Sequence, residues 1–189
     1  MKQVLLIGDS IREGYCKMVA EALQEQAEVI YPSENCRSTQ YVLMRMLPWS
    51  GLCNKEDVAV VHLNCGQWDA ARFNYTAVPL TSVEEYERNM HSIVWVLKSF
   101  FPNAQIVLAT TTPMNPEHPE TCNPRTTDEI MRYNEAVIRV AQDENLPLND
   151  LFAISKRWGA EYYIDYCHLT QEGYRQLAQK VTETIQQYL

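Results

Sequence analysis

The sequence is short of basic residues. Sixteen Lys and Arg stand against twenty-four Asp and Glu among 189 residues, which gives a formal net charge of −8. Proteins that bind nucleic acids or anionic membranes use clustered Lys and Arg, and no basic stripe is present here. We therefore expect neither a nucleic-acid partner nor a membrane partner.

Long apolar segments and metal-binding motifs are also missing. No apolar run approaches the roughly eighteen residues of a membrane helix, and the first run is too short for a secretory signal. Six cysteines occur without a Cys-x-x-Cys pair or a zinc-like Cys/His spacing, and His62, His91 and His118 show no ligand spacing either. These absences predict a cytoplasmic protein with reduced thiols and no metal site.

The length and apolar content are those of one folded unit. With 46% hydrophobic residues, a chain of 189 residues can bury a sizeable core and is short for two. We expect a single domain over residues 1–189. Apolar runs of strand length alternate with amphipathic stretches of helix length, which predicts βαβ crossovers and a parallel sheet with helices on both faces.

Hydrophobic periodicity and punctuation predict the elements. The expected strands span residues 2–8, 27–31, 57–64, 104–110 and 146–151, and the expected helices span 12–26, 39–47, 82–101, 126–145 and 170–189. We expect the second helix to end before Pro48, because proline has no N–H for an intrahelical bond. Two irregular segments, 69–81 and the proline-rich 112–125, follow strands at the carboxyl edge. They either wall a site there or serve as rigid surface connections.

Two motifs at opposite ends of the chain carry the chemistry. Gly8-Asp9-Ser10 follows the first apolar strand, and a serine on such a turn projects its hydroxyl from the edge where open α/β folds keep their sites. Asp165 and His168 stand just before the last helix. A serine needs a base to become nucleophilic, histidine has a suitable pKa, and a carboxylate fixes the imidazole. The pattern predicts a serine hydrolase with Ser10 as nucleophile, His168 as base and Asp165 as its orienting partner.

Structural roles are the alternatives for the same residues. Ser10 is also a suitable helix N-cap, Asp165 can cap the last helix, and His168 can be an ordinary surface residue. The Gly-Asp-Ser turn can alternatively hold a phosphate at a helix N-terminus, although it lacks the repeated glycines of such loops.

With these motifs at its two ends, the chain resembles the SGNH or GDSL hydrolases, a superfamily of serine esterases and acylhydrolases. The resemblance covers essentially the whole chain, with Gly8-Asp9-Ser10 matching the first block and Asp165-x-x-His168 the last. It implies a flavodoxin-like, three-layer α/β/α sandwich whose five parallel strands have the order 2-1-3-4-5. It also implies the Ser10, His168 and Asp165 roles given above, and catalysis without a cofactor.

The middle blocks depart from the family pattern. Arg37 stands where the second block usually has a glycine whose N–H joins the oxyanion hole. In the third block, Gly66-Gln67-Trp68-Asp69, Trp68 replaces the asparagine that supplies the other donor. A lost donor costs about 10²–10³ in rate, so a substitute is needed. We expect Asn64, beside the Ser10 amide and the Arg37 amide or guanidinium, to supply it.

Each of these residues also has a structural interpretation. Asn64 can instead bond a neighbouring loop, and Arg37 can be a plain surface residue. Trp68 either stacks on a sugar ring or packs under its loop, and Asp69 is expected to bond loop amides. His62 lies in an apolar strand and is expected to be a hydrogen-bonded core residue.

The Asn-x-Gly-x-Trp arrangement resembles divergent branches of the superfamily that handle acyl groups on sugars. The resulting hypothesis is a serine esterase for a small acyl group, acetyl, on a carbohydrate or similar polar molecule. The alternatives are a thioesterase or lysophospholipase, an acyltransferase, and a non-catalytic binding protein with a degenerate oxyanion hole. The sequence leaves the oligomeric state open.

Overall fold

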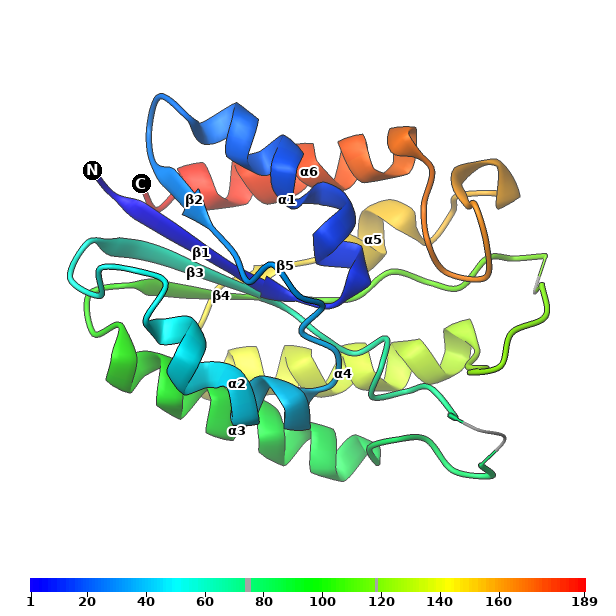
Figure 1. Cartoon of the computed structure of the whole chain (residues 1–189). Helices are drawn as coiled ribbons and strands as arrows, with labels where there is room; N and C mark the ends of the chain where they lie inside the picture. Colours follow the sequence, from blue (N-terminus) through cyan, green and yellow to red (C-terminus); the bar gives the residue numbers. More distant parts are fainter. Residues whose placement is uncertain (74–75, 118) are drawn as a thin grey trace.

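The computed structural model describes residues 1–73, 76–117 and 119–189. Five parallel strands form one sheet in the order β2-β1-β3-β4-β5, as the family resemblance implies (Figure 1). The strands are β1 (Gln3–Gly8), β2 (Glu28–Ile30), β3 (Val58–Asn64), β4 (Gln105–Ala109) and β5 (Leu148–Asn149).

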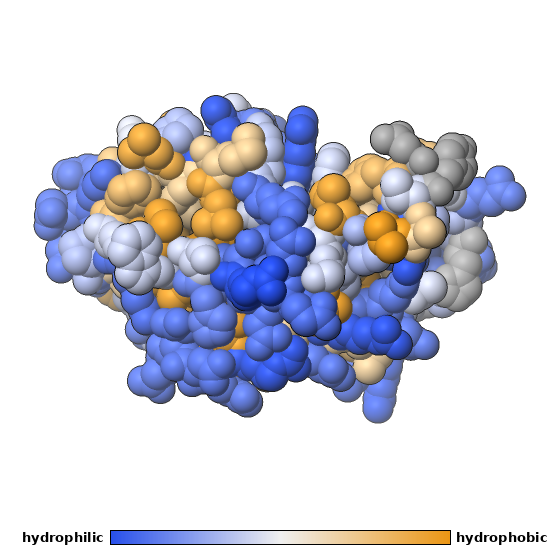
Figure 2. All heavy atoms as spheres, turned by 90° about the horizontal axis from the view of Figure 1, so that it is seen from below, coloured by the Kyte–Doolittle hydropathy of each residue, from blue (hydrophilic) through white to orange (hydrophobic). Residues whose placement is uncertain are grey.

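Helices cover both faces of this sheet, which confirms the predicted three-layer α/β/α architecture. One layer holds α1 (Ser10–Leu23), α5 (Leu151–Ser155) and α6 (Gln171–Gln186), and the other holds α2 (Thr39–Ser50), α3 (Val83–Phe100) and α4 (Thr127–Asp143) (Figure 1). The layer of α2, α3 and α4 lies below the sheet in Figure 1 and forms the face seen in Figure 2, where hydrophobic patches alternate with hydrophilic ones. The part of the chain that the structure describes contains no helix long and apolar enough to span a membrane.

Strand β1 shows how the sequence builds two cores. Leu5 and Ile7 face the layer of α2, α3 and α4, whereas Val4 and Leu6 face α1 and α6. All four side chains are fully buried. Successive strand residues point to opposite faces, so a parallel strand covered on both sides needs an unbroken apolar run.

Helix α2 passes through Pro48 and ends at Ser50, so the prediction that it stops before the proline is wrong. Because proline has no N–H, Pro48 removes one intrahelical hydrogen bond, and this loss falls in the last turn of the helix. The amide of Gly51 bonds to the carbonyl of Pro48 at 3.2 Å, and the amide of Leu52 bonds to that of Trp49 at 3.0 Å. These bonds satisfy the carbonyls at the helix end and let the last turn form.

The chain after β4 differs most from the prediction. Strand β5 has only two residues, and the short helix α5 and a 3-10 turn at Ala160–Tyr162 were not predicted. Asp150 Oδ1 accepts the amide of Ala153 at 3.0 Å and so turns the chain from strand to helix.

Register brings the ends of four strands to one edge. Gly8 pairs with Asn64, Asn64 with Ala109, and Ala109 with Asn149. The segments that follow these residues therefore meet at the carboxyl edge of the sheet, away from the two chain termini (Figure 1). Open parallel sheets hold their ligands at this edge.

Candidate active site

Ser10 opens α1 directly after β1. The cap of this helix is Asp9, whose Oδ1 accepts the amide of Ile11 at 3.0 Å. The interpretation of Ser10 as the N-cap is therefore wrong, and its hydroxyl is left for other contacts. Burial raises the pKa of Asp9 to about 6.

The structure brings Ser10, His168 and Asp165 into one line of hydrogen bonds. His168 Nε2 lies 2.9 Å from Ser10 Oγ across a sequence separation of 158 residues, and His168 Nδ1 lies 2.7 Å from Asp165 Oδ2. An ionised carboxylate only accepts, so Nδ1 carries the proton and Nε2 has the lone pair that faces the serine O–H. In this arrangement the imidazole can take a proton from the hydroxyl.

Asp165 is kept ionised by its own loop. Partial burial by itself raises the pKa of this carboxyl, but the hydrogen bonds from the amides of Cys167 and His168, together with His168 itself, outweigh burial and lower it. These amides lie 2.9 Å and 2.7 Å from Asp165 Oδ1. The loop is tied to the segment after β4, because Asn115 Nδ2 donates to the carbonyl of Asp165 at 2.9 Å. Nothing in the local sequence indicated this role for Asn115.

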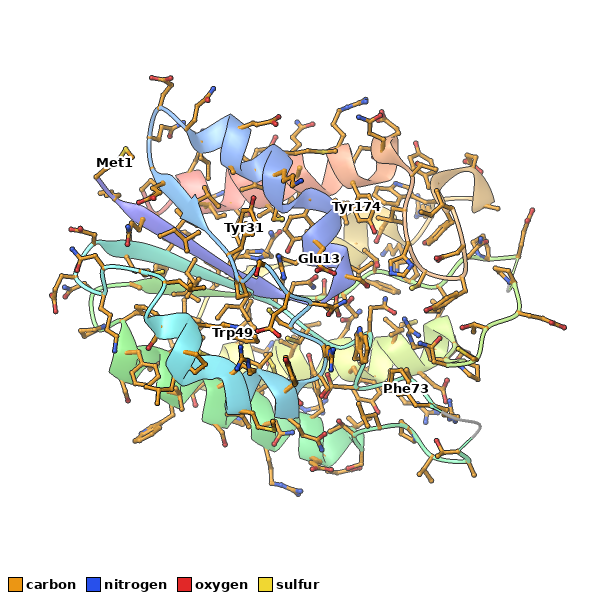
Figure 3. All side chains as sticks on the ribbon, in the orientation of Figure 1. Met1, Glu13, Tyr31, Trp49, Phe73 and Tyr174 are labelled. Carbon is orange, nitrogen blue, oxygen red and sulfur yellow. The ribbon has the colours of Figure 1, made fainter. Side chains whose placement is uncertain are left out.

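A small cavity of about 140 Å³ opens at Ser10 and His168. Its other lining residues are Asn35, Gln67, Trp68, Phe73, Asn123, Arg125, Tyr166 and Cys167. Phe73, labelled in Figure 3, belongs to the irregular segment after β3, so part of this segment walls the site.

One wall of the cavity is held by Arg125. Its Nε donates to Gln67 Oε1 at 2.8 Å, its Nη2 to Cys167 Sγ at 3.3 Å, and its guanidinium lies 5.3 Å from the centre of the Tyr166 ring. Gln67 in turn donates to the carbonyl of Thr112 at 2.7 Å. Sequence reasoning missed Arg125 and Gln67, because their partners come from segments far apart in the chain.

The thiol beside His168 is buried. Burial raises the pKa of Cys167 to about 12, so the group is a neutral thiol at neutral pH. Potential ligand atoms of Asp165, Cys167 and His168 lie within 4.8 Å of one another. In this geometry they bond to one another, to Ser10 or to Arg125.

The sequence model of the GDSL-like lipase/acylhydrolase family matches residues 6–176. The chain belongs to this family. A GDSL esterase/lipase of Arabidopsis thaliana is 27% identical to it over 211 aligned residues, covering 98% of this chain and 86% of the relative. The protein is accordingly a carboxylic ester hydrolase.

Solved structures share the fold of this GDSL-family esterase. An acetyl xylan esterase, AlAXEase, has a TM-score of 0.76 at 21% identity, covering 97% of this chain and 99% of that protein. A lipase/acylhydrolase from Enterococcus faecalis has a TM-score of 0.78 at 20% identity, covering 99% and 96%. At these identities the likeness establishes the fold.

Asn64 does not supply a donor to the cavity of this esterase. Its side chain is fully buried at the end of β3, and its Nδ2 donates to the carbonyl of Thr110 at 3.2 Å. The amide satisfies the backbone of the segment after β4, which is the structural alternative considered for it. Asn64 is not among the residues that line the cavity, so the geometry does not support its expected role as an oxyanion donor.

Arg37 is also engaged elsewhere. Its amide donates to Asn35 Oδ1 at 2.8 Å, and its guanidinium lies 4.9 Å from the Tyr41 ring centre and 5.6 Å from that of Trp68. The expected role of the Arg37 amide in the oxyanion hole is therefore not supported, because a hydrogen bond already uses its proton. The residue has a φ of 53°, the left-handed conformation that glycine adopts most readily.

The third-block residues divide between structure and site. Gly66 has a φ of 137°, and a Cβ there would lie 3.1 Å from Thr111 Cγ2. Trp68 lines the cavity, with its ring centre 5.0 Å from that of Phe73. Asp69 is fully buried and accepts the hydroxyl of Thr39 at 2.6 Å and its amide at 3.1 Å, so it holds the start of α2. Burial raises the pKa of Asp69 to about 6.

The other histidines lie outside the cavity or outside the described residues. His62 is fully buried and its Nε2 lies 3.0 Å from Asn149 Nδ2, which confirms the prediction of a hydrogen-bonded core histidine. Burial lowers its pKa to about 3. His91 contacts Glu144 at 2.9 Å on the surface of α3. His118 lies outside the described residues.

Proposed function

We propose that this esterase removes a small acyl group, acetyl, from a carbohydrate or similar polar molecule through an acyl-enzyme on Ser10. The observation that carries the proposal is the hydrogen-bonded line from Ser10 through His168 to Asp165 at the mouth of the 140 Å³ cavity. Neither half of the reaction calls for a metal or an organic cofactor.

The chemistry follows from the tautomer of His168. Nε2 accepts the proton of Ser10 as Oγ attacks the ester carbonyl, and Asp165 stabilises the resulting imidazolium through Nδ1. His168 then gives this proton to the departing alcohol, which leaves an acyl-Ser10. Water attacks the acyl group with His168 again as base, and the free acid departs.

The sizes of two neighbouring cavities favour a small acyl group and a larger alcohol. The 140 Å³ cavity is below the roughly 300–1,000 Å³ of pockets for drug-sized ligands, so a short acyl group suits it. A second cavity of about 830 Å³ shares Arg125 and Tyr166 with the first. Its other walls are Met114, Asn115, Pro119, Glu120, Thr121, Cys122, Pro124 and Thr126.

Polar groups in the wall of the larger cavity suit a polyhydroxy alcohol. Glu120, Asn115 and Thr121 give it carboxylate, amide and hydroxyl groups, and Tyr166 gives it an aromatic ring. The similarity to an acetyl xylan esterase is consistent with this substrate class.

A fluorophosphonate tests the nucleophile without knowledge of the substrate. We expect one adduct at Ser10 by peptide mapping, absent after Ser10→Ala and strongly slowed after His168→Ala, because an unassisted hydroxyl is a weak nucleophile. Labelling at another residue, or no labelling of folded protein, contradicts the triad and favours a binding protein.

Substrate class is tested with matched esters. We expect acetyl esters of xylan oligosaccharides to be turned over at least tenfold more efficiently (kcat/KM) than octanoyl esters, acyl thioesters or lysophospholipid, because the small cavity limits the acyl chain. Ester products that form on adding polyols would identify an acyltransferase. A preference for octanoyl esters would overturn the assignment to acetyl groups.

A further inference from the structure

We infer that the side-chain amide of Asn35 is a catalytic hydrogen-bond donor: its Nδ2–H binds the oxyanion formed when Ser10 attacks. The inference rests on the proposed function and names a residue that supplies what Asn64 and Arg37 do not. Asn35 is half-buried and lines the same small cavity as Ser10 and His168.

Hydrogen bonds to backbone carbonyls anchor the side-chain amides of Asn64 and Gln67, and a hydrogen bond to Asn35 engages the Arg37 amide. Asn64 donates to the Thr110 carbonyl at 3.2 Å, Gln67 donates to the Thr112 carbonyl at 2.7 Å, and the Arg37 amide donates to Asn35 at 2.8 Å. Within residues 1–73, 76–117 and 119–189, Asn35 Nδ2 has no hydrogen-bond partner. Both N–H groups of the Asn35 side chain are therefore unengaged at the cavity wall.

The orientation of this donor is set by its own oxygen. Asn35 Oδ1 accepts the amide two residues on, at Arg37, which is an Asx turn. With the oxygen engaged by the backbone, the planar amide turns Nδ2 away from that bond. The left-handed φ of 53° at Arg37 closes the turn. A fixed amide suits an oxyanion hole, because its dipole needs no reorganisation during the reaction.

The segment that contains Asn35 is hydrogen-bonded directly to the Gly8-Asp9-Ser10 turn. The amide of Cys36 donates to the carbonyl of Gly8 at 3.1 Å, two residues before Ser10. Arg12, only 1% exposed, adds bonds from one guanidinium to the carbonyls of Gly8 at 3.3 Å and Glu34 at 2.7 Å. Arg12 is thus a positioning residue that holds Asn35 beside Ser10.

Asn123 is the other asparagine on the cavity wall, and its connections differ. It lies on the proline-rich segment, where its carbonyl accepts Arg125 Nη1 at 3.0 Å and its Oδ1 accepts the hydroxyl of Thr121 at 2.6 Å. These bonds tie it to the proline-rich segment rather than to the turn that carries Ser10. It therefore serves as a comparison for Asn35.

In the reaction, the Ser10 Oγ–C bond forms while the π pair of the ester carbonyl moves onto its oxygen. The serine proton goes to His168 Nε2. Asn35 Nδ2–H and the backbone N–H of Ser10 bind the new oxyanion, since the first N–H groups of a helix have no intrahelical acceptor. When the carbonyl reforms, the alkoxide leaves with the proton from His168, and the two donors return to a neutral carbonyl oxygen.

Asn35→Asp is the sharpest test, because it keeps the oxygen that accepts from Arg37 and removes the donor. We expect kcat for an acetyl ester to fall about 10²–10³-fold with KM changed less than about threefold, since the donor acts on the transition state. Asn35→Ala removes the donor without adding charge and is expected to lower kcat about 10²-fold. Unchanged urea unfolding of Asn35→Asp excludes a folding defect.

Asn123→Asp is the matched control, since it places the same charge on the same cavity. We expect it to lower kcat less than about tenfold. An Asn35→Asp enzyme within threefold of wild type, or an equal loss in Asn123→Asp, overturns the inference and leaves the proposed function intact. Wild-type protein without Ser10-dependent hydrolysis overturns both.

Discussion

At the scale of single residues, a buried carboxyl group at the Ser10 turn makes a contribution to the free energy of unfolding that depends on pH. Asp9 is fully buried, and burial raises its pKa from 3.8 to about 6. The folded state therefore binds this proton more tightly than the unfolded chain. Asp9 contributes stability that is fully present below pH 3.8 and is lost as the pH rises through about 6.

Asp9→Asn tests this linkage, because asparagine keeps the oxygen that accepts from Ile11. Between pH 5 and pH 7.5 we expect the free energy of unfolding to fall about 1 kcal/mol more in wild type than in the variant. Urea unfolding at the two pH values measures the difference. His62, whose lowered pKa acts in the opposite direction, is present in both proteins and cancels. Equal pH slopes would contradict the raised pKa.

At the scale of elements, α1 and α6 pack closely at a glycine. A Cβ at Gly14 of α1 would overlap the ring of Tyr174 on α6, a residue labelled in Figure 3. Glycine inside a helix normally costs about 0.5–1 kcal/mol relative to alanine. Here the glycine is favoured by helix packing rather than by backbone conformation.

Helix propensity alone would predict that Gly14→Ala raises the free energy of unfolding, but the packing predicts the opposite. We expect it to lower the free energy of unfolding by about 1–3 kcal/mol, because the added methyl displaces the Tyr174 ring. The double variant Gly14→Ala with Tyr174→Leu removes the overlap, and its loss should be smaller than the sum of the single losses. A more stable Gly14→Ala protein would show that the helices separate without cost.

At the scale of the whole molecule, two cavities meet at the Arg125–Tyr166 wall on the carboxyl edge of the sheet. The proposed division assigns the acyl group to the small cavity and the alcohol to the large one. Cys122 lines the large cavity and is the exposed member of the six free cysteines, all of which are among the described residues.

Attachment of a bulky maleimide to Cys122 tests that division. We expect the adduct to raise KM for acetylated xylan oligosaccharides about tenfold, while kcat/KM for p-nitrophenyl acetate changes less than twofold, because only the larger alcohol reaches the blocked cavity. Cys122→Ser, treated in the same way, controls for labelling at other thiols. An equal loss on both substrates would place the alcohol elsewhere.

The sequence by itself determined the alternation of buried strands and amphipathic helices, since strand and helix periodicity are local properties. It also placed Ser10 after the first strand and Asp165 with His168 before the last helix. Strand order was available only through the family resemblance, because pairing between strands is not a local property. The passage of α2 through Pro48 depended on hydrogen bonds that complete its last turn.

Only the tertiary structure decided which polar groups face the cavity. Asn64 and Asn35 are the same residue type, and the sequence does not separate their roles. In the structure the amide of Asn64 bonds to the Thr110 carbonyl, whereas Asn35 lines the cavity. The bonds of Arg125 to Gln67 and Cys167 likewise join segments 58 and 42 residues apart. Such partners are set by packing of the whole sheet edge, which brings together backbone carbonyls and side chains that no local pattern relates.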